Sequence, residues 1–316
     1  MQSPGLNCYV AFNVVNDKKQ IMKYKGKRKE ENMITSLSNK SVREVVQLNQ
    51  KAKARNKQDL FVVEGVKMFL EAPQERISRV YLAQRAEKEL REAYGRKLDK
   101  TGCEVVADDV FDKMSDTKTP QGILTLVKQY HYRLEELLER KQNRTCIDRK
   151  TGRSISIIGG VRKKNLMYLI VEDIQDPGNL GTIFRTGEAA GVDGIIMSSR
   201  TVDLYNPKTI RSTMGSVYRV PFVYTEDICH TIRILQEHDI SVYAATLDGE
   251  KFYDEYDYRK NTAFLIGNEG NGLRKETAAC ADAYISIPME GNVESLNVAA
   301  ASTVLFYEAY RQRRKG

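Results

Sequence analysis

The amino-acid sequence predicts an α/β protein built from two domains, and three observations support this prediction. The chain has 316 residues, and at roughly 100 to 200 residues per domain this length suggests two domains. Short apolar runs alternate with stretches of helical period along most of the chain. Hydrophobic residues make up 41% of the sequence, which is enough to bury a core and excludes collagen-like, mucin-like and coiled-coil proteins.

The first predicted domain spans residues 33–128 and follows an arm, residues 1–32, that has no clean period. Its expected elements are, in chain order, a helix from residue 41, strands at 60–63 and 77–82, a helix at 86–98, and strands at 104–106 and 123–127. Strands and helices in alternation are typical of an α/β domain with a largely parallel sheet. A smaller α/β domain is therefore expected in front of the second one.

A polar and basic linker, residues 129–164, is expected to begin with a helical stretch at 129–139 and to include a short hairpin around 150–153. The second domain, residues 165–316, is again predicted to be α/β. Its expected elements are, in chain order, a strand at 166–171, a turn at 177–181 leading into a helix that ends at 190, strands at 193–197, 242–245 and 263–266, and a closing helix at 296–311. The closing helix is expected to bury a face formed by Leu296, Ala300, Val304 and Tyr307.

Several classes of protein are excluded by composition. Five scattered cysteines without a CxxC pair predict reduced thiols in a cytoplasmic protein, with neither a disulfide framework nor a zinc site. Three histidines without metal-ligand spacing argue against a metal hydrolase and a Ser-His-Asp enzyme. No stretch approaches the roughly 18 apolar residues of a membrane span, and the early apolar patch at 9–15 precedes its basic run, the reverse of a secretory signal.

Positive charge is concentrated in three segments. Residues 1–32 carry seven basic against three acidic side chains, residues 139–165 carry nine against two, and residues 311–316 carry four against none. Such segments attract polyanions, because neutralising phosphates releases counterions. Composition alone does not distinguish RNA from DNA or from an anionic membrane surface, and basic tails that only keep a protein soluble are an alternative.

Ligands of an α/β sheet bind at the carboxyl ends of its strands, so the loops after Val171, Ala245 and Ile266 are candidate sites. The first of these loops carries Asn179, which offers an amide, and Arg185, which suits a phosphate. Taken alone, a helix N-terminus with a salt-bridging arginine explains this loop equally well.

Two further loops are rich in glycine or amides. The segment 264–273 has three glycines in six residues, but its spacing is neither the dinucleotide fingerprint nor a Walker phosphate loop. Glu269 in its middle argues against a phosphate and suits a neutral or cationic ligand. In the segment 285–301, Ser295 is expected to cap the last helix, and Asn292 and Asn297 crowd the same helix mouth.

Taken together and in this order, the three loops resemble the SpoU (TrmH) family of RNA ribose 2′-O-methyltransferases, within the SPOUT class. The matching motifs are Asn179-Leu-Gly with Arg185, Gly267-Asn-Glu-Gly-Asn-Gly-Leu, and Ile287-Pro-Met-Glu-Gly with Ser295-Leu-Asn-Val-Ala. The resemblance covers residues 165–312. The stretch Phe61-Val-Val-Glu-Gly-Val-Lys also resembles the start of the ribosomal-protein-like substrate-binding domain that many members carry.

The resemblance implies a deep trefoil knot in the C-terminal domain, a homodimer with composite active sites, and S-adenosyl-L-methionine as methyl donor, with no metal. The implied catalytic residues are Arg185, which the family credits with activating the hydroxyl, and Asn179, Glu269, Ser295 and Asn297, which position the ribose and Arg185. The implied donor-binding residues are Thr246, Gly267, Gly270, Ile287, Met289 and Leu296. Because a guanidinium is normally never a base, a phosphate-binding role for Arg185 is the alternative.

The sequence therefore predicts a cytoplasmic enzyme that methylates ribose 2′-oxygens of structured RNA. The front domain favours 23S ribosomal RNA over transfer RNA, which is the alternative substrate. A non-catalytic RNA-binding protein is a second alternative. A dinucleotide-dependent dehydrogenase is rejected, since the GxGxxG after the first strand is missing.

Overall fold

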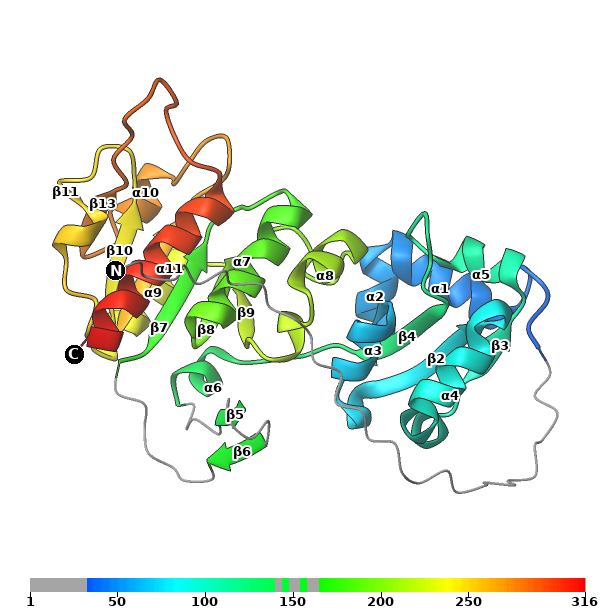
Figure 1. Cartoon of the computed structure of the whole chain (residues 1–316). Coiled ribbons are helices and arrows are strands. Elements are labelled where there is room, and N and C mark those ends of the chain that lie inside the picture. The colour runs from blue at the N-terminus through cyan, green and yellow to red at the C-terminus, as the bar shows by residue number, and fades with distance from the viewer. Residues whose placement is uncertain (1–32, 140–143, 148–153, 158–164, 316) are drawn as a thin grey trace, which may run out of the picture. The chain divides into compact units, whose positions relative to one another are not determined.

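The computed structural model describes residues 33–139, 144–147, 154–157 and 165–315 (Figure 1). The predicted basic arm, residues 1–32, and most of the basic part of the linker lie outside the described residues.

The front domain contains a four-stranded sheet with the strand order β1-β4-β2-β3. Its elements are α1 (Lys40–Gln50), α2 (Ala52–Gln58), β1 (Leu60–Glu64), α3 (Val66–Glu71), a 3-10 turn (Gln74–Arg76), β2 (Ile77–Ala83), α4 (Gln84–Thr101), β3 (Glu104–Val106), α5 (Asp108–Met114) and β4 (Ile123–Lys128). The predicted strands and the helices from residue 41 and at 86–98 are confirmed to within a few residues.

The prediction of a largely parallel sheet in this domain is wrong. Strand β4 lies between β1 and β2 and runs antiparallel to both, so that only β2 and β3 are parallel. Alternation of strands and helices does not determine strand direction, because the last strand can enter the middle of a sheet from either end.

Helix α1 illustrates why the local sequence signals were reliable here. Asn39 caps it, since its side-chain oxygen accepts a hydrogen bond from the backbone N–H of Ser41 at 2.8 Å. Val42, Val45 and Leu48 recur at helical spacing and are all buried. The cap and the apolar stripe mark the helix in the sequence, and packing of Val42, Val45 and Leu48 against the sheet stabilises it.

Between the domains, the helical stretch is shorter than predicted and the hairpin is present. Of residues 129–139, only α6 (Leu134–Leu138) is helical. Its Leu137 and Leu138 are buried in the same hydrophobic cluster as Tyr168 and Ile170. Strands β5 (Arg144–Ile147) and β6 (Ser154–Ile157) pair antiparallel, with Thr145 opposite Ser156. The predicted turn at 150–153 lies outside the described residues.

The C-terminal domain contains a seven-stranded sheet in the order β11-β13-β10-β12-β7-β8-β9, in which every pair is parallel. Its strands are β7 (Met167–Val171), β8 (Gly194–Ser198), β9 (Phe222–Thr225), β10 (Ser241–Ala245), β11 (Lys251–Phe252), β12 (Thr262–Ile266) and β13 (Ala283–Ser286). Its helices are α7 (Pro177–Ala190), α8 (Pro207–Thr213), α9 (Ile228–Glu237), α10 (Lys275–Ala278) and α11 (Val298–Lys315), with 3-10 turns at Ser216–Tyr218 and Tyr253–Glu255.

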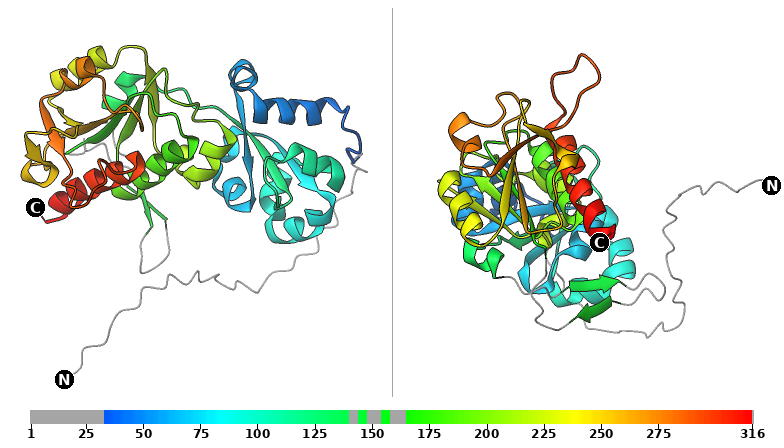
Figure 2. Two further views of the ribbon diagram at one scale, coloured as in Figure 1. Left: turned by 90° about the horizontal axis from the view of Figure 1, so that it is seen from above. Right: turned by 90° about the vertical axis from the view of Figure 1, so that its left-hand side faces the viewer.

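Helices cover both faces of this sheet. Leu169 and Val171 of β7 point to the face where α7 and α11 pack, whereas Tyr168 and Ile170 point to the face where α9 and α10 pack. Figure 2 shows α9 and α11 on opposite sides of the strands. Burial on both faces explains the continuous apolar runs that identified β7 and β12 in the sequence.

The predicted apolar face of the closing helix is wrong. Helix α11 begins at Val298, and the residues that it buries include Leu305, Phe306 and Ala309. Leu296 precedes the helix and is 36% exposed, and Tyr307 is 45% exposed. The helix is apolar on more than one face, and its own sheet can cover only one of them.

The prediction that the cysteines are all free is also wrong. Cys229 in α9 and Cys280 after α10 form a disulfide with their Cα atoms 5.7 Å apart. The two residues are separated by 51 positions, so no local pattern could pair them. Cys103 is buried and forms no disulfide, and Cys8 lies outside the described residues.

Within the described part of the chain, no helix is both long and apolar enough to cross a bilayer. The same residues contain no group of three or more histidine, cysteine, aspartate or glutamate side chains arranged to hold a metal ion.

Candidate functional site

Three segments that are far apart in the sequence meet at the carboxyl edge of the seven-stranded sheet. They are the start of α7 after β7, the loop after β12, and the residues that lead into α11. One chain of hydrogen bonds joins them. Asn297 Nδ2 donates to Asn179 Oδ1 at 2.9 Å, and Asn179 Nδ2 donates to Glu269 Oε1 at 3.1 Å. Three of the predicted catalytic residues are therefore in contact.

The backbone around Asn297 determines which side-chain atom donates in each of these hydrogen bonds. Asn297 Oδ1 accepts hydrogen bonds from the N–H groups of Ala299 and Ala300, at 2.9 and 3.3 Å, so it is Asn297 that caps α11. Its Nδ2 must then face Asn179, whose amide is oriented in turn. Asn297 thus donates to Asn179, and Asn179 donates to Glu269.

Glu269 is held as a carboxylate. Its oxygens accept hydrogen bonds from the backbone N–H groups of Gln175 and Asp176, both at 3.0 Å, as well as from Asn179. Partial burial raises the pKa of Glu269, but these hydrogen bonds together outweigh it, and the net pKa is lowered. An ionised carboxylate whose lone pairs are occupied by protein donors is a weak base, and it is suited to orienting neighbours.

Asp176 supports the same edge from the start of α7, where it is the N-cap. Its Oδ1 accepts from the Asn179 N–H at 2.9 Å, which caps the helix, and its Oδ2 accepts from Lys208 Nζ at 2.8 Å. The hydrogen bond from Lys208 is the largest cause of the lowered pKa of Asp176. The loop that carries Asn179 is thus held from α8 as well as from Glu269.

The loop after β12 is a tight turn that requires Gly267. Asn268 and Gly272 exchange two backbone hydrogen bonds, at 3.0 and 2.9 Å. A Cβ atom at Gly267 would lie 2.1 Å from the carbonyl carbon of Gly272, which no side chain could tolerate. Gly270 is exposed, with open space around its α-carbon apart from the Asn268 side chain.

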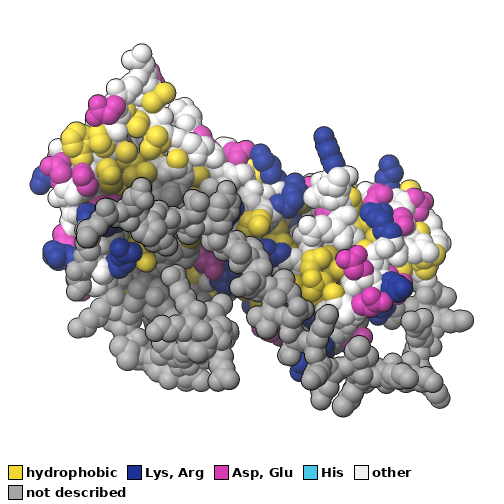
Figure 3. All heavy atoms as spheres, viewed as in Figure 1, with side chains coloured by type: hydrophobic (Ala, Val, Ile, Leu, Met, Phe, Trp, Pro, Cys, Tyr) yellow, Lys and Arg dark blue, Asp and Glu magenta, His cyan; other side chains and the backbone are white. Residues whose placement is uncertain are grey.

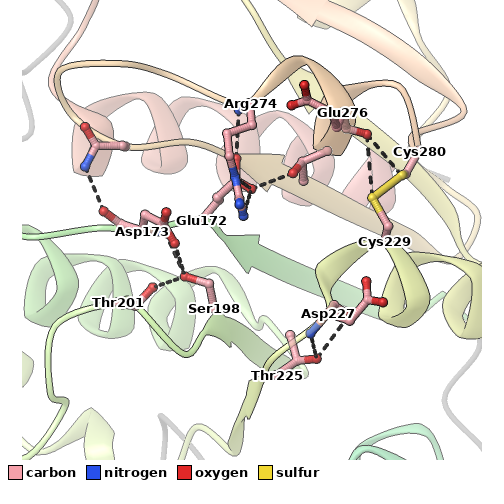
Figure 4. A network of polar contacts seen from close by, with 12 residues as sticks. Glu172, Asp173, Ser198, Thr201, Thr225, Asp227, Cys229, Arg274, Glu276 and Cys280 are labelled. Carbon is pink, nitrogen blue, oxygen red and sulfur yellow. Dashed lines mark hydrogen bonds and ion pairs between the residues drawn. A yellow bond between two sulfur atoms is a disulfide. The ribbon is translucent and has the colours of Figure 1, made fainter.

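A second carboxylate at this edge was missed by sequence reasoning. Glu172, at the end of β7, is 1% exposed and accepts hydrogen bonds from the Arg274 backbone at 2.9 Å, the Arg274 guanidinium at 2.8 Å and the Thr277 hydroxyl at 2.6 Å. Figure 4 shows Glu172 and Arg274 pointing toward one another from β7 and from the segment before α10. An acidic residue ending an apolar strand, with Arg-x-x-Thr downstream, was the available signal.

Two predicted catalytic residues lie outside the hydrogen-bonded chain. Arg185 is exposed on α7, and it makes no hydrogen bond or ion pair with the residues that the structure describes. Ser295 is exposed and is not the helix cap, so that prediction is wrong. Asn297 takes the cap because α11 begins at Val298, one residue after it.

The predicted donor-binding residues lie on the loops at the same edge. The Thr246 hydroxyl after β10 is buried and has no hydrogen-bond partner among the described residues. Ile287 and Met289 are half-buried, and Ile287 packs against the core. Leu296 is 36% exposed, and Val293 and Leu247 on the neighbouring loops are 63% and 67% exposed. The predicted donor-binding residues therefore add apolar side chains to an edge that also carries the hydrogen-bonded amides and carboxylates.

This arrangement defines a class: a parallel α/β protein with a ligand site built from loops at the carboxyl edge of its sheet. Its hydrogen-bonded amides and carboxylate can orient a sugar or an amide-rich ligand, while they offer no strong nucleophile.

Comparison with known proteins specifies the class further. Residues 166–307 match the model of the SpoU rRNA methylase family, and residues 39–125 match that of the MRM3-like substrate binding domain. The chain is 30% identical over 264 residues to the 23S rRNA (guanosine-2′-O-)-methyltransferase RlmB of Shewanella oneidensis, covering 82% of this chain and 99% of that protein. It is 31% identical over 205 residues to the 23S rRNA (guanosine(2553)-2′-O)-methyltransferase RlmP of Bacillus subtilis, covering 65% and 71%.

A solved structure agrees with these matches. The AdoMet-bound rRNA methyltransferase of Sinorhizobium meliloti superposes with a TM-score of 0.70 at 29% identity, covering 88% of this chain and 97% of that one. This protein belongs to the SpoU rRNA methylase family.

Proposed function

We propose that this protein transfers a methyl group from S-adenosylmethionine to a ribose 2′-oxygen of structured RNA, with 23S ribosomal RNA as the substrate. The observation that carries the proposal is the chain from Asn297 through Asn179 to Glu269, because it unites the three family motifs at one edge of the sheet. The names of the relatives from Shewanella oneidensis and Bacillus subtilis support 23S ribosomal RNA. Transfer RNA is the alternative substrate.

The residues at this edge fit the methyl donor. The Thr246 hydroxyl is buried and has no hydrogen-bond partner among the described residues. Burying an unpaired hydroxyl costs free energy, and a bound ligand that supplies a hydrogen-bond partner removes this cost. Gly267 permits the tight turn after β12, and Gly270 in that turn is exposed, so its backbone can pair with an adenine edge. We assign donor binding to Thr246, Gly267, Gly270, Ile287, Met289 and Leu296. The low density of positive charge suits a ligand that is itself a sulfonium cation.

When bound, the donor supplies an electrophilic methyl group for in-line displacement. The chain's own residues must then align the 2′-oxygen and assist removal of its proton. Asn179 and Asn297 have orientations set by their neighbours, and Glu269 remains ionised, so these groups hold the ribose and the α7 loop. Ser295, exposed next to them, adds a hydroxyl to the same surface.

We assign Arg185 to the phosphate beside the target ribose. Its guanidinium is exposed and has no carboxylate partner among the described residues, and it offers a fork of donors that matches a phosphate. Proton transfer from the 2′-hydroxyl then passes to that phosphate or to solvent, since an arginine keeps its own proton.

The proposal extends to domains and assembly. Residues 33–128 bind the RNA, residues 129–164 link the domains, and residues 165–316 form the catalytic domain with the trefoil knot of the family. We propose a homodimer in the cytoplasm. Supporting it, the outer face of α11 carries Tyr307 and Tyr310, 45% and 41% exposed, and Figure 3 shows hydrophobic side chains gathered over this part of the domain.

The first experiment is transfer of tritium from labelled S-adenosylmethionine to total ribosomal RNA. Alkali-resistant label at a 2′-O-methyl dinucleotide is expected with the wild-type protein. Arg185→Ala is expected to lose about 100-fold or more in rate while donor binding persists, because a transition-state contact is removed. Arg233→Ala, an exposed arginine on the other side of the sheet, is the matched control and should keep full activity.

The outcomes separate the alternatives. Label in transfer RNA but not in ribosomal RNA would select the other substrate. Donor binding in the absence of label on either RNA or on intact ribosomal subunits would contradict the transfer reaction. RNA binding without donor binding would favour a non-catalytic RNA-binding protein.

A further inference from the structure

The disulfide between Cys229 and Cys280 joins two elements on one side of the catalytic sheet. Cys229 lies in the first turn of α9, and Cys280 lies two residues beyond the end of α10. Both side chains are half-buried, so small reagents can reach them. Figure 4 shows the bond bridging the two elements, close to the contacts of Glu172.

The two ends of this crosslink differ in how firmly they are held. Helix α9 is anchored in the core through Ile228, Ile232 and Leu235, all of which are buried. Helix α10 has only four residues, and it connects directly to the 267–273 loop on its N-terminal side. The disulfide therefore attaches a short helix, which buries Thr277 and Ala278, to a longer helix that is anchored in the core.

Polar contacts also attach the segment from 267 to 282, among them those of Glu269 with Gln175, Asp176 and Asn179. Arg274 and Thr277 bind the buried carboxylate of Glu172, and Gln236 of α9 donates to the Cys280 carbonyl at 3.1 Å. When the disulfide opens, these polar contacts remain, so the segment stays docked but loses its covalent attachment. The predicted donor-binding residues Gly267 and Gly270 lie at the far end of the same segment.

The local geometry accommodates both redox states. The carbonyl oxygen of Glu276 lies 3.6 Å from Cys229 Sγ and 3.2 Å from Cys280 Sγ. Once the bond is reduced, each thiol finds an acceptor at that oxygen without a change of backbone. A disulfide in a cytoplasmic protein is usually transient or redox-sensing rather than structural.

We propose that the Cys229–Cys280 pair is a redox-responsive clamp on the donor-binding loop, such that the oxidised protein binds S-adenosylmethionine more tightly than the reduced protein. This inference rests on the proposed function. Closing the clamp joins the two sulfurs, releases two protons and passes two electrons to a small-molecule disulfide, which becomes two thiols. A dithiol reductant reverses the step.

The test compares donor affinity by calorimetry for the full chain oxidised with excess small-molecule disulfide and reduced with dithiothreitol. The dissociation constant is expected to rise about fivefold or more on reduction, at the lower end of typical coupling between sites. The double variant Cys229→Ser with Cys280→Ser should bind like the reduced protein under both conditions. Cys103→Ser is the control at a buried cysteine outside the pair and should keep the wild-type response.

Amide hydrogen exchange over residues 267–282 gives a readout that does not depend on donor binding. Faster exchange in the reduced protein is expected, because the segment opens locally more often. A redox effect on exchange without an effect on affinity would reduce the pair to a structural crosslink and overturn the proposal, as would equal exchange in both states. If the donor bound in neither state, the proposed function would fail, and exchange alone would still decide whether the pair restrains the loop.

Discussion

Two glutamates at the carboxyl edge of the same sheet are held in opposite ways. Glu172 is buried and binds a guanidinium and a hydroxyl. Glu269 is exposed, and the donors that it binds are neutral N–H groups of Gln175, Asp176, Asn179 and, at 3.4 Å, Asn268. The first carboxylate has its charge cancelled within the protein. The second keeps its charge at the surface, at the centre of a set of oriented amides.

The difference indicates a division of roles. A buried carboxylate with an arginine partner fastens α10 and its loop to β7, so its loss should appear as instability. An exposed carboxylate with neutral donors contributes less to stability but presents a defined charge and orients its neighbours, so its loss should appear in activity. Substitutions at the two positions can test this separation.

The largest effect on stability is expected from Glu172→Gln. The change removes the negative charge from a buried group that makes three hydrogen bonds, and we expect the free energy of unfolding to fall by about 2 to 3 kcal/mol. Urea denaturation measures it. Asp257→Asn, which breaks the exposed Asp257–Arg259 pair, is the control and should change the free energy of unfolding by less than about 1 kcal/mol. If Glu172→Gln and Asp257→Asn changed the free energy of unfolding equally, the stabilising role assigned to the buried Glu172 would be contradicted.

Glu269→Gln should show the reverse signature. An amide in this place turns a donor toward the Gln175 or Asn179 N–H groups, which disturbs the orientation of Asn179. We expect the rate of methyl transfer to fall about tenfold, which corresponds to about 1.4 kcal/mol, with a smaller change in stability. Glu290→Gln removes an exposed carboxylate from the loop before α11 and should leave the rate unchanged. A folded, fully active Glu269→Gln protein would contradict the assigned role.

Asn297 offers two substitutions that separate its contacts. Asn297→Ala removes the cap of α11 and should destabilise the protein by about 1 kcal/mol. Asn297→Asp restores an acceptor for the Ala299 and Ala300 N–H groups but cannot donate to Asn179. Stability near wild type with low methyl transfer is therefore expected for Asn297→Asp. Recovery of both properties would show that only the cap matters.

The smallest expected effect is on the dependence of stability on pH. The pKa values of Glu269 and Asp176 are lowered in the folded protein, so their contribution is present above the unfolded values of about 4 and is lost as the pH falls through the folded values. Solvent screens both groups, so we expect less than about 1 kcal/mol from each. Denaturation below pH 4 should cost Glu269→Gln less stability than wild type. Identical profiles would argue that Glu269 makes no net contribution.

Sequence reasoning located the strands, most helices and three residues of the site. These features depend on local signals, such as the apolar run of β7 or the glycines of the 267–272 turn. It missed the pairing of Glu172 with Arg274, which lie 102 positions apart, and it chose Ser295 instead of Asn297 as the cap of α11. The second error arose because the start of a helix moves by a residue or two under tertiary packing.

The sequence by itself determined the two-domain α/β class, the order of the elements and the motifs that identify the family, because periodicity, turn residues and motif spacing are properties of neighbouring positions. Only the tertiary structure decided the antiparallel entry of β4, the buried face of α11, the bond between Cys229 and Cys280, and the orientation of the Asn297–Asn179–Glu269 chain. Each of these depends on which distant groups compete for the same space or the same hydrogen-bond partner. That competition is settled only when the whole domain packs.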